Sequence, residues 1–188
     1  MIYEEGGFYH VYNRGCNKEL IFYSNEDYEN LLRRINKSKP WENFNIIAFC
    51  LMPNHYHFLI QQKSDIPISN WINYVFNGYV QSFNKQYNRS GTLFEGRAKP
   101  LFIDKENYLI RLVLYIHNNP VAACLVNDPG EWKYSNYLEW VGKRDNKLFD
   151  KVFFFEHFDS YNDFEILMKD YTKQKQDLEK IKPYIHEL

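Results

Sequence analysis

Cysteine is scarce in this sequence, whose 188 residues include only Cys16, Cys50 and Cys124. The three are far apart, odd in number, and form no C-x-x-C pair. This pattern argues against a cysteine-based metal site and indicates reduced thiols, as expected of a cytoplasmic protein.

Long apolar runs are absent as well. No segment approaches the roughly 20 apolar residues that a membrane-spanning helix needs. The N-terminus has no basic, apolar and small-residue pattern of a secretion signal. We therefore expect a soluble, cytoplasmic protein with no membrane partner.

The chain also lacks an excess of positive charge, since its net charge is −1. Broad attraction to nucleic acid is therefore not expected, and any such contact has to come from local basic patches. Two patches are candidates, the segment 33–39 and the group Lys85, Arg89, Arg97 and Lys99. Aromatic residues, by contrast, are abundant at 19% of the chain. Most are expected in the core, although exposed rings could stack on bases.

The chain length suits one core with additions rather than two domains. Apolar and turn patterns predict strands over 8–13, 44–51, 55–61 and 100–103, and helices over 25–39, 68–87 and 104–120. The helix over 25–39 is expected to have Ser24 as its N-cap, Asp104 is expected to cap the third helix, and Pro120 is expected to close it. The resulting βαββαβα order predicts an α+β fold of the ferredoxin-like type.

Beyond this core the pattern is weaker. We expect residues 1–130 to form the main domain and residues 131–188 to form a C-terminal helical extension packed on it. Within the extension, a short helix is expected over 132–141 and a longer, highly charged one over 163–182.

Two histidines stand at the start of the strand 55–61, directly after a Pro53–Asn54 turn. Because strand side chains alternate between faces, His55 and His57 share one face and Tyr56 points to the other. Two imidazoles in this arrangement form half of a metal site. The alternative is that each histidine packs or forms hydrogen bonds on its own.

The third helix carries residues that could complete such a site. Tyr115 and Asn119 are four positions apart and so share one helix face. A tyrosine hydroxyl can act as a nucleophile, and an amide oxygen can bind a hard divalent cation. Equally, Tyr115 could be a packed aromatic residue and Asn119 a cap before Pro120.

Several strings in the chain resemble those of a known family. They are YHVYNRG (9–15), MPNHYHFLI (52–60), GTLFEGR (91–97), YIHNNPVAA (115–123) and WKYSNY (132–137). Together they resemble the single-tyrosine transposases with a His-hydrophobic-His motif. The third and fourth strings are most similar to the REP-associated tyrosine transposase branch. The resemblance covers about residues 7–140.

The resemblance implies a ferredoxin-like enzyme that cuts and rejoins single-stranded, hairpin-bearing DNA. Tyr115 would form a 5′-phosphotyrosine, and His55, His57 and Asn119 would hold Mg²⁺ or Mn²⁺. Imidazole ligands suit Mn²⁺ better than Mg²⁺. The insertion-sequence relatives act as dimers and the REP-associated branch can act as monomers, so both states stay open.

Arg14, Arg97 and Lys99 are the candidates for contact with the DNA backbone. The rivals for metal binding, His10 and His117, are poorer candidates, since His117 lies on another helix face from Tyr115.

Two other functions remain open on the sequence alone. One is a domesticated DNA-binding protein that keeps the fold without cleaving DNA. The other is a zinc hydrolase built on His55 and His57, which would need a further His, Cys, Asp or Glu ligand.

Overall fold

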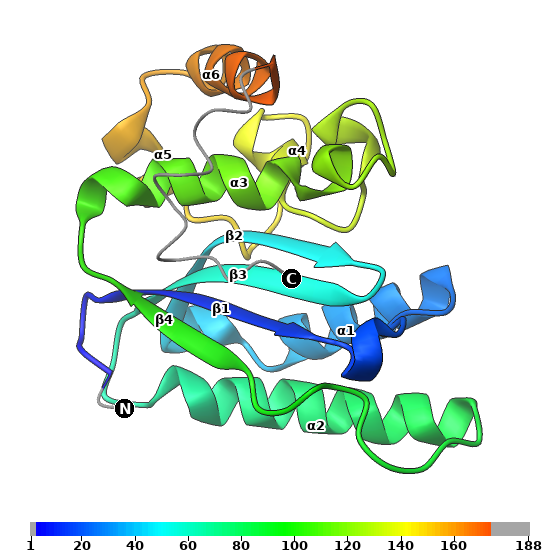
Figure 1. Ribbon diagram of the computed structural model, residues 1–188. Helices are drawn as coiled ribbons and strands as arrows, with labels where there is room; N and C mark the ends of the chain where they lie inside the picture. The colour runs from blue at the N-terminus through cyan, green and yellow to red at the C-terminus, as the bar shows by residue number, and fades with distance from the viewer. Residues whose placement is uncertain (1–2, 174–188) are drawn as a thin grey trace.

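The computed structural model describes residues 3–173. Its core has the predicted βαββαβα order, and the α+β, ferredoxin-like fold class is confirmed (Figure 1). The core elements are β1 (Phe8–Arg14), α1 (Asn25–Lys37), β2 (Phe44–Met52), β3 (His55–Gln62), α2 (Ile68–Gln86), β4 (Lys99–Ile103) and α3 (Leu109–Ala122). Short 3-10 turns and three further helices complete the described chain: η1 (Cys16–Lys18), η2 (Pro40–Glu42), η3 (Glu106–Tyr108), η4 (Pro129–Glu131), α4 (Tyr137–Trp140), α5 (Lys151–His157) and α6 (Tyr161–Lys173).

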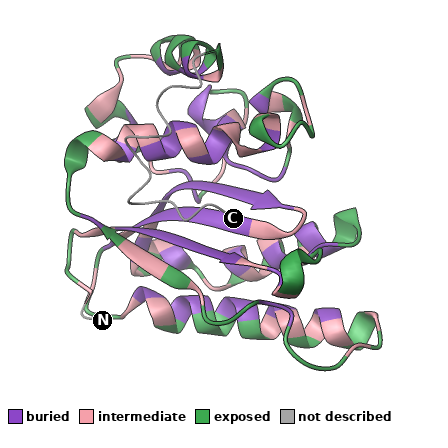
Figure 2. Cartoon of the chain, viewed as in Figure 1, coloured by how far each residue is buried: buried purple, intermediate pink, exposed green. Residues whose placement is uncertain are grey.

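The four strands form one antiparallel sheet in the order β2-β3-β1-β4. Helices α1 and α2 cover one face of this sheet, and α3 lies across the other (Figure 1). The central strands are therefore buried on both sides, as Figure 2 shows. No helix in the described part of the chain is long and apolar enough to span a membrane.

The alternation of β3 explains how two cores form. Tyr56, Phe58 and Ile60 belong to the cluster beneath α1 and α2. Leu59 belongs to the second cluster, between the sheet and α3. Since His57 lies on the same side of the strand as Leu59, it faces α3, and this face holds the site described below.

Helix α1 begins where the sequence predicts. Ser24 is its N-cap, and the Asp27 carboxylate accepts hydrogen bonds from the backbone N–H groups of Tyr23 and Ser24 at 2.8 and 3.0 Å. These bonds satisfy donors at the start of the helix that would otherwise be unpaired.

Helix α3 differs from the prediction at both ends. Asp104 does not cap it, because the single turn η3 intervenes and the helix begins at Leu109. Pro120 does not close it either, because the helix continues to Ala122. Pro120 lies in the last turn, where its missing N–H removes only one bond, and the N–H of Ala123 still donates to the Asn119 carbonyl at 2.9 Å.

The short helix predicted over 132–141 is mostly wrong, since only α4 is helical there. The preceding residues are extended beside β2, where the Leu51 N–H donates to the Tyr134 carbonyl at 3.0 Å. The Trp132 indole N–H donates to the Leu51 carbonyl at 3.0 Å. β2 is an edge strand, so these contacts cover hydrogen-bonding groups that would otherwise stay open. Of the longer predicted helix, α6 accounts for the described part, and residues 174–182 lie outside the described residues.

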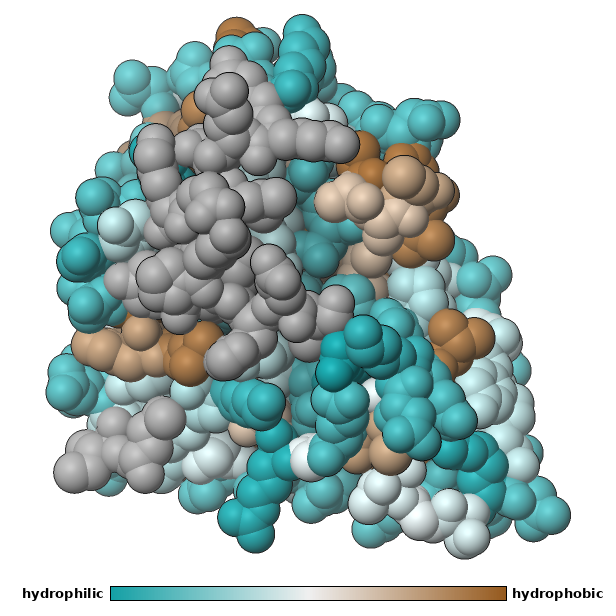
Figure 3. All heavy atoms as spheres, in the orientation of Figure 1, coloured by the Kyte–Doolittle hydropathy of each residue, from teal (hydrophilic) through white to brown (hydrophobic). Residues whose placement is uncertain are grey.

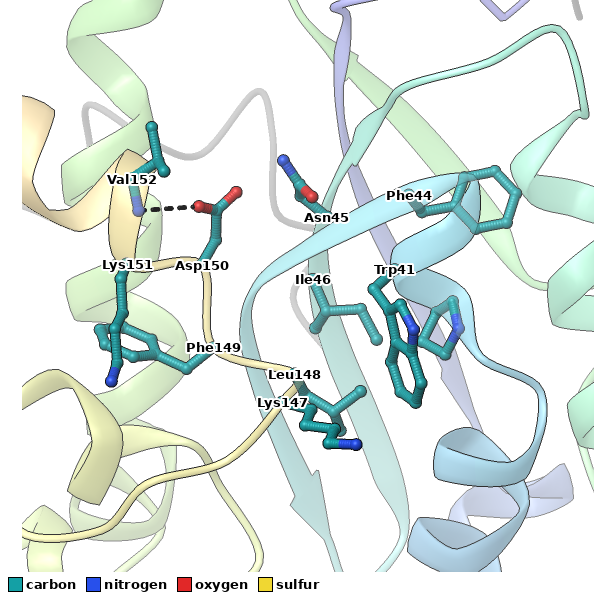
Figure 4. A pocket seen from close by; sticks show the side chains of 11 residues that line it. Trp41, Phe44, Asn45, Ile46, Lys147, Leu148, Phe149, Asp150, Lys151 and Val152 are labelled. Atoms are coloured by element: carbon teal, nitrogen blue, oxygen red, sulfur yellow. Dashed lines mark hydrogen bonds between the residues drawn. The ribbon is translucent and has the colours of Figure 1, made fainter.

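Residues 147–152 cross the start of β2 and enclose a hollow of about 170 Å³ (Figure 4). Trp41, Ile46 and Leu148 are among the residues that line it. Asp150 then starts α5 by accepting from the N–H groups of Val152 and Phe153, at 3.0 and 3.1 Å. The outer surface in the view of Figure 3 is mainly hydrophilic, with apolar residues in separate groups.

Asn136 joins the C-terminal segment to the outer edge of β2, which among the described residues has no neighbouring strand on that side. The buried Asn136 amide binds two backbone groups at this edge: it accepts from the Phe49 N–H at 2.8 Å and donates to the Ile47 carbonyl at 2.9 Å. The same oxygen also accepts from His117 at 2.9 Å.

We expect Asn136→Ala to lower the free energy of unfolding by about 2–4 kcal/mol, because it leaves several buried polar groups unpaired. Urea denaturation followed by circular dichroism measures this. Asn70→Ala, at an exposed position of α2, is the matched control and should change stability little. Equal stability of the two variants would contradict the bridging role of Asn136.

Candidate functional site

The structure brings four of the predicted site residues together between β3 and α3. His55 and His57 lie on the α3 side of the sheet, with ring centroids 5.1 Å apart and planes at 81°. The Tyr115 ring meets the His57 ring edge to face, with centroids 5.5 Å apart. Asn119 lies one helical turn beyond Tyr115, and its Nδ2 donates to the Tyr115 carbonyl at 2.8 Å.

The protonation of His55 is fixed by its neighbour in the turn. Asn54 Nδ2 donates to the Lys18 carbonyl at 3.2 Å, so Asn54 Oδ1 is the atom that lies 2.7 Å from His55 Nδ1. An amide oxygen only accepts, and therefore His55 carries its proton at Nδ1. Its Nε2 lone pair is buried and has no hydrogen-bond partner among the described residues.

The pKa of His55 is lowered to about 4, mainly by burial; interaction with the Asn119 side chain opposes this shift, and nearby Arg14 adds to it. The imidazole is thus neutral at pH 7, which is the form that binds a metal.

His57 is fully buried, and its Nδ1 lies 2.9 Å from Nε2 of His10. Burial lowers the pKa of His57 well below its usual range, and the neighbouring His10 and His55 lower it further. Like that of His55, its Nε2 is buried without a hydrogen-bond partner in the described part of the chain.

Burial raises the pKa of Tyr115 to about 12, while interaction with Asn119 lowers it and Cys50 raises it. The phenol is therefore protonated at neutral pH. A tyrosine hydroxyl that acts as a nucleophile has to lose this proton.

The donor set fits a hard divalent cation. His55 and His57 would hold such an ion through two buried imidazole nitrogens that have no hydrogen-bond partner in the described part of the chain, and Asn119 would add an amide oxygen. Within residues 3–173, no group of three or more His, Cys, Asp or Glu side chains is arranged to hold a metal. The geometry thus gives no support to the zinc hydrolase, which needs a further ligand of that kind.

The three predicted DNA contacts line a hollow of about 460 Å³ beside this site. Arg14 lies opposite His55 in the β1–β3 register, Arg97 comes from the segment before β4, and Lys99 is the first residue of β4. Arg14 is already paired with both carboxylate oxygens of Glu95 at 2.9 Å. Arg97 and Lys99 are exposed.

The wall of this hollow depends on a close approach at Gly15. A side chain there would have its Cβ 2.0 Å from the Glu19 carbonyl oxygen. The Gly15 N–H donates to the Asn54 carbonyl at 2.8 Å, which ties the end of β1 to the turn before His55. The absence of a side chain at Gly15 thus lets the end of β1, which lines the hollow, lie close to the turn before His55.

Residues 6–119, from just before β1 to Asn119, match the family model described as "Transposase IS200 like". The match spans well over half of the 188 residues. The chain belongs to the IS200-like transposase family. The membership predicted from the ordered motifs is thereby confirmed, and the matched segment contains every residue of the site between β3 and α3.

One solved structure agrees with this chain in fold. A REP-associated tyrosine transposase bound to a REP hairpin superposes with a TM-score of 0.60 at 18% identity, covering 80% of this chain and 95% of that one. A candidate transposase from Deinococcus radiodurans R1 gives a TM-score of 0.42 at 14% identity, covering 59% and 88%. No curated protein matches the chain.

Sequence reasoning missed two residues of this site. The sequence predicts Asn54 only as part of a turn, although its place next to His55 is visible in the string PNHYH. It offers His10 only as a weak metal ligand, whereas His10 contacts His57 from the neighbouring strand. His117 lies apart from the site, bonded to Asn136.

Proposed function

We propose that this transposase cleaves and rejoins single-stranded, hairpin-bearing DNA, with Tyr115 as nucleophile and with Mg²⁺ or Mn²⁺ held by His55, His57 and Asn119. The observation that carries the proposal is the meeting of Tyr115 with two imidazoles whose Nε2 atoms are buried and unpaired among the described residues. A packed aromatic residue alone does not require such neighbours.

The reaction follows from the chemistry of these groups. Tyr115 loses its proton, and its oxygen forms a bond to the scissile phosphorus while the bond to the 3′ oxygen breaks. The 3′ oxygen takes up a proton and leaves as a hydroxyl, and the 5′ phosphate stays on the tyrosine. Reversal by a 3′ hydroxyl rejoins the strand without ATP, because one phosphoester bond replaces another.

A divalent cation held by His55, His57 and Asn119 would supply Lewis-acid chemistry, which would offset charge on the phosphate oxygens and favour ionisation of a nearby phenol. The side chains of this chain orient the reactants. Asn119 interacts with both Tyr115 and His55, so it couples the nucleophile to the metal-binding pair. The high pKa of Tyr115 explains why the phenol needs such assistance at pH 7.

One copy of the chain supplies all of these groups, since α3 packs on the same sheet that carries His55 and His57. This supports a monomer that is competent for cleavage. A dimer that exchanges the tyrosine helix between subunits remains the alternative.

The proposal is tested with labelled single-stranded DNA from the sequence flanking the gene, folded as hairpins, in the presence of Mn²⁺. We expect a covalent protein–DNA adduct on a denaturing gel, and no adduct with the same sequence as a perfect duplex. A band shift on a native gel without any adduct would instead support the domesticated DNA-binding protein.

The exposed basic residues of the hollow should contribute to DNA affinity. We expect the double variant Arg97→Gln, Lys99→Gln to weaken binding and to reduce the slope of log K against log salt by about 1.4, because each phosphate that a cation neutralises on a single strand adds roughly 0.7 to this slope. Fluorescence anisotropy over a salt series measures this slope.

The matched control is the double variant Arg33→Gln, Lys37→Gln, which removes the same charge from α1, on the opposite face of the sheet. It should retain the wild-type slope. A larger reduction of the slope in the control would place the DNA-binding surface on α1.

A further inference from the structure

His10 is a buried histidine that the proposed reaction does not use directly. It lies on β1, where the register pairs Tyr12 with His57 and His10 with Leu59. His10 is thus the diagonal neighbour of His57 on the same sheet face. The two ring planes are nearly parallel, at 18°, with centroids 5.1 Å apart, and both residues are fully buried.

The bond between these rings decides which nitrogen of His57 has a lone pair to offer. A hydrogen bond between two imidazole nitrogens needs one N–H and one lone pair. If His57 Nδ1–H donates to His10 Nε2, then His57 Nε2 has a free lone pair. If His10 Nε2–H donates instead, the proton of neutral His57 sits on Nε2, and this atom cannot bind a metal.

We propose that His10 is a positioning residue, which accepts the Nδ1–H of His57 and so holds the tautomer with the Nε2 lone pair directed into the site. The proposal rests on the proposed function, because it takes His57 to be a metal ligand. In the arrangement proposed, His10 carries its own proton at Nδ1.

The neighbouring histidine supports this assignment independently. His55 is held in the same tautomer by Asn54 Oδ1, and its Nε2 is likewise buried and unpaired among the described residues. With His10 acting on His57 as Asn54 acts on His55, both imidazoles present lone pairs to the same site. Ligating histidines commonly donate their other ring N–H to an outer partner, which fixes the tautomer and the ring orientation.

The tautomer can be measured directly by long-range ¹H–¹⁵N correlation NMR on ¹⁵N-labelled protein without metal or DNA. We expect His57 to be protonated at Nδ1 and unprotonated at Nε2. His117 provides an internal reference of the opposite kind, because its Nε2 donates to the Asn136 amide oxygen. A wild-type His57 protonated at Nε2 would overturn the proposal.

Two variants separate positioning from packing. His10→Leu fills the space but offers no acceptor, and it should shift His57 toward the Nε2–H tautomer and weaken Mn²⁺ binding by about 10- to 100-fold. His10→Gln retains an acceptor oxygen and should restore the His57 tautomer and most of the affinity, measured by electron paramagnetic resonance of free Mn²⁺. An unchanged His57 tautomer in folded His10→Leu also contradicts the proposal. If His10→Leu does not fold, the His57 tautomer seen in the spectra of the wild-type and His10→Gln proteins tests the proposal.

Failure of the proposed function has a different signature, namely a wild-type protein that binds no Mn²⁺ whatever the tautomer of His57. The wrong tautomer in a protein that still binds Mn²⁺ overturns the role of His10 alone.

Discussion

Tyr115→Phe is expected to abolish the covalent protein–DNA adduct, with a decrease of about 10³-fold or more in the rate of strand cleavage. The substitution removes only the hydroxyl oxygen that would bond to phosphorus. The aromatic ring, which lies edge-on against His57, is retained, so the fold and the metal-binding pair should persist. Adduct formation on denaturing gels, with single-stranded hairpin DNA and Mn²⁺, measures the effect.

Tyr12 provides the sharpest comparison for this experiment. It is another tyrosine close to His57, with ring centroids 6.3 Å apart. Unlike Tyr115, it lies on strand β1 and not on a helix that also carries Asn119. Tyr12→Phe should still form the adduct, and Tyr115→Phe should still shift the DNA on a native gel. An adduct that forms with Tyr115→Phe but not with Tyr12→Phe would identify Tyr12, and not Tyr115, as the nucleophile.

The pairing of His55 with His57 was predictable because strand alternation is a local property of the sequence. The contact between His10 and His57 was not, since it depends on the strand order and register that place β1 beside β3. Similarly, the spacing of Tyr115 and Asn119 predicts a shared helix face but not its position opposite β3. Only the family resemblance suggested that Tyr115 and Asn119 lie next to His55 and His57.

The error over residues 132–141 has a comparable cause. Local pattern favoured a helix there, but the Tyr134 carbonyl and the Asn136 side chain are bound to backbone groups at the edge of β2. These partners lie more than 80 positions earlier in the chain. No local signal reports the unpaired groups of a distant strand, and tertiary contacts of this kind override helix propensity.

Metal removal should abolish DNA cleavage. In His55→Ala, added metal should not restore it. EDTA is expected to abolish adduct formation by the wild-type protein, with Mn²⁺ restoring it at lower concentration than Mg²⁺, since imidazole ligands favour Mn²⁺. Of the two proposed ligands, His55 is the better one to replace, because His57 is fully buried and its replacement would also break the hydrogen bond to His10.

Because His55 is proposed to bind the metal directly, His55→Ala should lower Mn²⁺ affinity strongly. The decrease should exceed the roughly 10- to 100-fold that is typical when a residue hydrogen-bonded to a metal ligand is replaced. Electron paramagnetic resonance of free Mn²⁺ measures this affinity, and His157→Ala in α5 serves as the control for removing an imidazole outside the site. Added Mn²⁺ should rescue the EDTA-treated wild-type and His157→Ala proteins but not His55→Ala. If His55→Ala keeps the wild-type affinity, the unpaired Nε2 atoms are not the metal ligands. Any adduct formed at Tyr115 must then be explained without them.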